Sequence, residues 1–306
     1  MVKYYSIMAM ILNLIIVHVR NGYSQNNTYP YVELELDKKF NSEQRRKEIV
    51  NNQELKRKAS LLKDNPIKAV LVVGPAEEET KGFIDRMKKV ESFLRSKNVE
   101  VHCFYYPNSD WESIKKATTD ASIFIYSGHG SGTGILPKEY VSNEDIIRDV
   151  KLRKNAVVLF NHVCFGAGSS ASDNDDIGLE EAENRVTEYA ETFYKVGAGC
   201  YFANNYHDSG LDFFKNLYSG KTVKQCYEHA VRYNNRIEKV DLCDFDSKLK
   251  IGISSRESDL PSIRTTYLND VKIEEEVPAI KGYDIAFVSK LDFKLENMLI
   301  KLNPKK

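Results

Sequence analysis

The chain of 306 residues contains no C-x-x-C pair, no excess of either charge, and no internal repeat or low-complexity tract. Without cysteines at metal-ligand spacing, we expect no structural zinc site. The 44 basic and 44 acidic residues balance to a net charge of zero, which argues against nucleic-acid binding and against electrostatic attachment to a membrane. The hydrophobic share of 42% and the charged share of 29% are ordinary for a soluble globular protein.

A hydrophobic run long enough to span a membrane is also missing. The apolar stretch from about Ile7 to Val19 is shorter than the roughly 20 residues that a spanning helix needs. Lys3 precedes this stretch, and the small residues Gly22 and Ser24 follow it, as in a signal peptide. We therefore expect residues 1–24 to direct export and to be cleaved, with no membrane attachment afterwards; an uncleaved anchor is the alternative.

Cysteine is scarce, with five residues in the whole chain. An odd number in an exported protein leaves at least one thiol free, and Cys164 is the candidate. Cys103 and Cys200 fall within strand-like runs, where a thiol is more often buried and inert.

Short apolar runs that alternate with helical patterns predict a doubly wound α/β domain over residues 66–240. Residues 25–65 are expected to form a polar linker and a charged helix, and residues 241–306 a C-terminal extension of the domain. The fold class that follows is a three-layer α/β/α sandwich with a mainly parallel sheet, an N-terminal helix and a small C-terminal β extension. The strands are predicted at 68–73, 99–105, 121–126, 156–160 and 199–203, with further strands at 249–253 and 285–288.

Two of the predicted strands end in reactive side chains. The run 121–126 leads into Ser127-Gly128-His129-Gly130, and the run 156–160 leads into Asn161-His162-Val163-Cys164. In open parallel sheets, ligands and chemistry lie beyond the carboxyl ends of the strands. Neighbouring strands are roughly 5 Å apart, so a thiol and an imidazole at adjacent strand ends can form a nucleophile and its base.

At these residues the sequence resembles the caspase-like cysteine peptidases, the superfamily of caspases, gingipains, metacaspases and CHAT-domain proteins. That superfamily carries a His-Gly after one strand and a Cys after the next, and the resemblance covers roughly Lys68 to Val240. It implies that Cys164 is the nucleophile, that His129 is the base, and that the N–H groups of Gly130 and Cys164 bind the oxyanion. It also implies a peptide or protein substrate and no redox or organic cofactor.

Two further groups of residues are candidates for substrate binding. A carboxylate in the first pocket, from Asp173, Asp175 or Asp176, would select Arg or Lys at the cleavage position, as in several relatives. The same aspartates could instead bind calcium or form a solvated loop. Family members also shape substrate pockets from the loop that follows the next strand, which here holds Asn204 and His207; an ordinary Asn-rich turn is the alternative.

The alternatives for this site concern its base and its activity. His162 lies two residues before Cys164. If the two side chains share one face of the strand, His162 would be a rival base. The alternative is that His162 packs beside the sheet. The glycines of 127–134 do not favour a phosphate loop, because residues 135–137 intervene before any helix. We predict a cysteine endopeptidase. The rivals are an inactive caspase-fold module that binds a peptide or partner, and a hydrolase or acyl-transferase acting on another amide.

Overall fold

The computed structural model describes residues 66–173, 175–206, 208–233, 237–244, 248–256, 262–268, 271–277 and 281–299. All of them fall within the unit Lys58–Lys306. The predicted signal peptide and the predicted linker and helix at 25–65 lie outside the described residues. Within the described ranges, no helix combines the length and the apolar character needed to cross a bilayer.

Five parallel strands form the first part of the main sheet, in the order β2-β1-β3-β6-β7. Strand β3 is buried along its whole length and β1 along all but its first residue, because helices cover both faces of the sheet. The five strands match the runs predicted from the sequence: β1 (Lys68–Val73), β2 (Glu100–Tyr105), β3 (Ala121–Ser127), β6 (Leu152–Asn161) and β7 (Ala198–Asn204).

Three antiparallel strands continue the same sheet beyond β7, in the order β12 (Gly282–Ser289), β9 (Lys250–Arg256) and β8 (Ile237–Asp244). The predicted runs 249–253 and 285–288 therefore belong to the main sheet. Strand β8 was not predicted, and neither was the hairpin of β10 (Ser262–Leu268) and β11 (Val271–Val277). The spacing of apolar residues predicts a helix over Val223–Ile237, whereas the structure has a helix at Val223–Tyr233 and strand β8 from Ile237.

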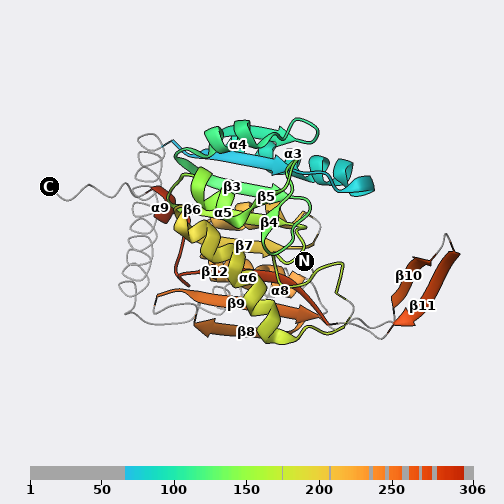
Figure 1. The fold of residues 1–306 in the computed structure, drawn as a ribbon. Helices are drawn as coiled ribbons and strands as arrows, with labels where there is room; N and C mark the ends of the chain where they lie inside the picture. Colours follow the sequence, from blue (N-terminus) through green and yellow to red (C-terminus); the bar gives the residue numbers. More distant parts are fainter. Residues whose placement is uncertain are drawn as a thin grey trace, which may run out of the picture. The chain divides into compact units, whose positions relative to one another are not determined.

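Helices cover the two faces of the sheet and complete three layers (Figure 1). One face packs against α4 (Trp111–Thr118), α5 (Asn143–Asp149) and α6 (Gly178–Lys195), with Phe160 and Phe193 in its core. The other packs against α3 (Thr80–Ser96), α7 (Ser209–Tyr218), α8 (Val223–Tyr233) and the short α9 (Leu295–Leu299). The architecture is thus the predicted α/β/α sandwich with a mainly parallel sheet.

A small hairpin fills the connection between β3 and α5. Its strands are β4 (Gly134–Ile135) and β5 (Val141–Ser142), which pair antiparallel. The hairpin runs directly into α5, whose start is fixed by a reciprocal capping box between Ser142 and Asp145. The segment that follows His129 is therefore anchored at its far end by a well-capped helix.

Candidate active site

The register of the sheet brings His129 and Cys164 to the same edge. Strands β3 and β6 are parallel, and Tyr126 lies opposite Phe160. His129 comes three residues after Tyr126 and Cys164 comes four residues after Phe160, so both lie just beyond the carboxyl ends of neighbouring strands. The structure therefore places these two residues beyond the ends of adjacent strands, as the sequence predicts.

Gly130 makes the contact between the two segments. A Cβ atom added to Gly130 would lie 2.6 Å from the carbonyl oxygen of Cys164, and equally close to a Val163 methyl carbon and the Tyr189 hydroxyl. Real Cβ atoms do not approach other atoms so closely, so only glycine allows the backbone after His129 to lie against Cys164.

The two segments also present unused backbone donors. Among the described residues, neither the N–H of Gly130 nor that of Cys164 makes a hydrogen bond. Most backbone donors near a sheet are paired, so two unpaired donors on touching residues are notable. A developing negative oxygen beside the thiol is the kind of acceptor that such a pair would suit.

The imidazole of His129 is held from the loop after β1. Its Nε2 is 3.0 Å from one carboxylate oxygen of Glu77 and 3.1 Å from the other. Glu77 opens the short 3₁₀ turn η1 (Glu77–Glu79). Within the described part of the chain, Nδ1 has no hydrogen-bond partner, and the ring makes no hydrogen bond to the Cys164 thiol. Donation from Nε2–H to Glu77 leaves Nδ1 as the basic nitrogen, and such dyads are often looser before substrate binds.

Buried tyrosine hydroxyls support the loops on both sides of this contact. The Tyr126 hydroxyl donates to the carbonyl of His129 at 2.7 Å and accepts from the N–H of Leu136 at 3.1 Å. The Tyr189 hydroxyl accepts from the N–H groups of Ser131 and Gly132, both at 3.1 Å, and donates to the carbonyl of Gly134 at 2.8 Å.

A third hydroxyl supports the segment after Cys164. Tyr201 donates to the carbonyl of Gly166 at 2.8 Å. Burial raises the pKa of Tyr126, Tyr189 and Tyr201 above the usual range, so all three stay protonated donors at any working pH. The loops that carry His129 and Cys164 therefore rest on uncharged groups within the core.

A hollow of about 360 Å³ lies beside Cys164. The carboxylate-bearing residue in its wall is Asp284, at a β-bulge where β12 shifts register between Tyr283 and Ile285. Bulges re-aim side chains and are common next to active sites. The Ser169 hydroxyl accepts from the N–H of Tyr283 at 2.6 Å, which ties the loop after Cys164 to this strand.

His162 lines the same hollow. Its ring stacks on Phe83 of α3, with centroids 5.3 Å apart and an interplanar angle of 17°. The backbone N–H of His162 donates to the carbonyl of Asn204 at 3.2 Å. The backbone of His162 has a φ of +57°, so the strand pleat is broken between β6 and Cys164. The premise that His162 and Cys164 share a strand face does not apply here, and the histidine packs against a helix.

The aspartates that follow Cys164 are not among the residues that line this hollow. Asp173 accepts from the Nη1 of Arg185 at 2.9 Å and from the N–H of Ser170 at 2.7 Å, and both ionic side chains are largely buried. Asp175 is exposed, and Asp176 is exposed and accepts from the N–H of Gly178 at 3.0 Å. Among the described residues, no group of three or more His, Cys, Asp or Glu side chains is arranged to hold a metal ion.

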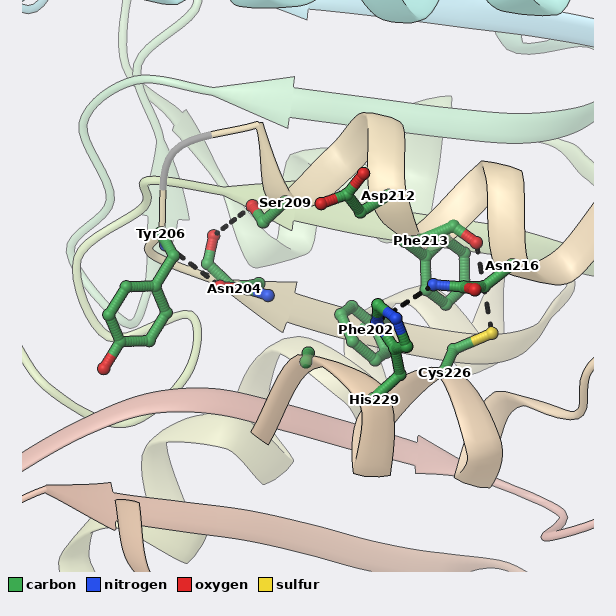
Figure 2. Close-up of a pocket in the computed structure, with 10 residues that line it drawn as sticks. Phe202, Asn204, Tyr206, Ser209, Asp212, Phe213, Asn216, Cys226 and His229 are labelled. Atoms are coloured by element: carbon green, nitrogen blue, oxygen red, sulfur yellow. Dashed lines mark hydrogen bonds between the residues drawn. The ribbon is translucent and has the colours of Figure 1, made fainter. Parts of the chain in front are cut away.

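Asn204 faces a different hollow, formed by β7, α7 and α8 (Figure 2). Its amide oxygen accepts from the N–H of Tyr206 at 2.9 Å, which is the Asx turn weighed from the sequence. The hollow encloses about 30 Å³, which is room for one or two water molecules. Its lining includes neither His129 nor Cys164. His207, the other candidate from this loop, lies outside the described residues.

Cys103 and Cys200 fit the inert role expected of them, and Cys226 resembles them. Burial raises the pKa of Cys200, and it raises that of Cys226 to about 12. Burial also raises the pKa of Cys103, which lies half-buried on β2. A thiol with a raised pKa is mostly uncharged at neutral pH and reacts slowly with electrophiles.

Three residues of the site were missed from the sequence: Glu77, Tyr189 and Asp284. Glu77 had a signal, because the loop after β1 must end on the same edge as the loop after β3 in a doubly wound sheet. Asp284 adjoins a predicted strand, but its place required knowing that β12 pairs with β7. Nothing in the sequence pointed to the role of Tyr189, because an aromatic residue at helical spacing indicates an ordinary core position.

Comparisons with known proteins do not place the chain in a family. No family model matches it, and no curated protein matches it. Among solved structures, a chain titled "Crystal structure of CapF with inhibitor 3-isopropenyl-tropolone" aligns over 74% of this chain and 93% of its own, with 11% identity and a TM-score of 0.20. A likeness this low carries no argument about fold or function.

Proposed function

We propose that the chain is a caspase-like cysteine endopeptidase that cleaves peptide bonds through Cys164 and His129. The observation that carries the proposal is the backbone contact between Gly130 and Cys164 at the ends of two neighbouring parallel strands. It brings a histidine, a thiol and two unpaired N–H groups to one place, in the order that the superfamily uses.

The proposed reaction proceeds through a thioester. His129 takes the proton of the Cys164 thiol on Nδ1, and the sulfur attacks the carbonyl carbon of the scissile bond. The N–H groups of Gly130 and Cys164 stabilise the oxyanion. The tetrahedral intermediate then expels the amine, which takes its proton from His129. Water, deprotonated by His129, hydrolyses the thioester and restores the thiol. Glu77 fixes the ring tautomer and favours the imidazolium that forms in between.

We further propose cleavage after Arg or Lys, with Asp284 as the residue that reads the cation. Asp284 lines the hollow beside Cys164, at the bulge of β12. This replaces Asp173, Asp175 and Asp176 in that role, because none of the three lines the hollow. A carboxylate is well suited to pair with a guanidinium or ammonium group.

The test is cleavage of a peptide library by the full chain and by matched variants. We expect Cys164→Ala and His129→Ala to abolish cleavage, and His229→Ala, a histidine at the other hollow, to retain it. Asp284→Asn should remove the preference for Arg or Lys, while Asp212→Asn at the other hollow should not.

A thiol-directed electrophile separates the enzyme from the inactive module. Site-resolved mass spectrometry should find that labelling of Cys164 is fast and depends on His129, while Cys200 and Cys226 label slowly. A library left intact, together with sluggish labelling of Cys164, would refute the peptidase. It would favour the module that binds a peptide or partner without cleaving it.

A further inference from the structure

A second, smaller hollow adjoins His129 rather than Cys164. It encloses about 140 Å³, and its wall includes His129, Gly130, Ile135, Leu136 and Tyr140. Among the described residues, no Asp, Glu, Lys or Arg lines it. The hollow beside Cys164 is more than twice as large, about 360 Å³, and includes Asp284. The two hollows therefore differ in size and in charge.

Tyr140 gives the smaller hollow an exposed aromatic wall. Its relative exposure of 52% exceeds that of Tyr106 (40%) and Ile147 (38%), the other exposed large hydrophobic residues in the described part of the chain. A Cβ added to Gly134 would lie 2.8 Å from the Cζ of Tyr140, so the ring lies directly over that glycine. The Tyr140 hydroxyl is 2.8 Å from the Oγ1 of Thr133. An aromatic ring that is fixed in position and still exposed to solvent is typical of a binding surface.

The loop that carries this wall is fixed before any ligand arrives. Asn143 donates from Nδ2 to the carbonyl of Gly132 at 2.9 Å and from its N–H to the carbonyl of Thr133 at 2.8 Å. Tyr189 bonds the same loop from inside the core. A hollow whose walls are already ordered loses little conformational entropy when a side chain enters it.

The direction of the bound chain follows from the proposed chemistry. The departing amine takes its proton from His129, so the residue after the cleaved bond lies on the side of His129. The residue before the bond carries the carbonyl that Cys164 attacks, and its side chain lies on the side of Cys164. The hollow that touches only His129 and the hollow that touches only Cys164 thus serve opposite sides of the scissile bond.

We propose that the hollow formed by Leu136 and Tyr140 beside His129 binds an apolar side chain on the first residue after the cleaved bond. The inference rests on the proposed peptidase function and adds a second selectivity to it. An aliphatic side chain of the size of Val or Leu gains burial there. A carboxylate or ammonium in the same place loses water, and the described lining offers no charged group other than His129, which Glu77 already holds.

The experiment is a series of peptides identical before the cleaved bond, with Leu, Val, Gly, Asp or Lys directly after it. For the full chain we expect kcat/KM to be about tenfold higher with Leu than with Gly or Asp, in the range that apolar pockets achieve. Tyr140→Ala should reduce that ratio to about twofold. Ile147→Ala, an exposed apolar residue on α5 outside the hollow, should leave it unchanged.

The outcomes separate this inference from the function beneath it. Cleavage of all five peptides at similar rates overturns the apolar hollow and leaves the peptidase standing. So does a Leu preference that persists in Tyr140→Ala. A preference that disappears in Asp284→Asn instead would reverse the assignment of the two hollows and overturn it as well. Failure of the full chain to cleave any peptide, with an unreactive Cys164, overturns both proposals together.

Discussion

Replacing Tyr189 with phenylalanine tests whether the loop after His129 depends on one buried hydroxyl. The Tyr189 ring is fully buried against Phe160, and the substitution keeps that packing while removing three hydrogen bonds. The lost partners are the N–H groups of Ser131 and Gly132 and one of the bonds to the carbonyl of Gly134. All lie in the segment that places Gly130 against Cys164.

The burial of each partner sets the size of the effect. Ser131 is exposed, so water can replace the hydroxyl there. The carbonyl of Gly134 keeps its bond from the N–H of Ser131, at 3.1 Å. The N–H of Gly132 is buried and has no substitute among the described residues. One buried donor without a partner costs about 1–3 kcal/mol. We therefore expect the free energy of unfolding to fall by about 2 kcal/mol.

Tyr218→Phe is the matched control. Its hydroxyl is also buried, but it has no hydrogen-bond partner in the described structure, and its ring meets Phe93 edge-on. Removing it should change stability by less than about 0.5 kcal/mol. In urea unfolding, with a slope of about 3 kcal/mol per molar, Tyr189→Phe should lower the midpoint by roughly 0.7 M and Tyr218→Phe should not. Equal midpoints for the two variants would refute the role given to Tyr189.

Three further substitutions probe the site. Glu77→Gln should lower kcat by no more than about fivefold, because the pair with His129 is exposed and such pairs contribute about 1 kcal/mol or less; a much larger loss would mean that Glu77 does more than orient the ring. Gly130→Ala forces the loop away from Cys164, so kcat should fall by about 100-fold or more, and near-normal turnover would remove Gly130 from the oxyanion site. Asp173→Asn weakens the tie to Arg185 and should lower the urea midpoint without altering the preference for Arg or Lys, whereas exposed Asp175→Asn should alter neither; a changed preference in Asp173→Asn would restore the role first predicted for it.

The sequence was most informative where structure depends on local pattern. Buried parallel strands are continuous apolar runs, so β1, β3 and β6 could be located without knowing their neighbours. Once they are placed in a doubly wound sheet, the residue after each strand must lie on the common edge. His129 and Cys164 follow from that rule alone. The close approach of Gly130 does not, because it depends on atoms from the loop after β6 and from α6 that only the folded chain brings together.

Nearness along the chain does not decide which carboxylate lines the larger hollow. Asp173 lies nine positions after Cys164 and seemed the natural carboxylate, yet α6 presents Arg185 to it, and the pair is 14% and 12% exposed. A largely buried ion pair of this kind does not reach out for a second cation, because separating it leaves a charge without compensation. Asp284 is 120 positions from Cys164, and an antiparallel strand with a bulge brings it to the hollow. Asp173 therefore anchors the loop after Cys164 to α6. The proposed selectivity for cations depends instead on Asp284, in the C-terminal part of the sheet.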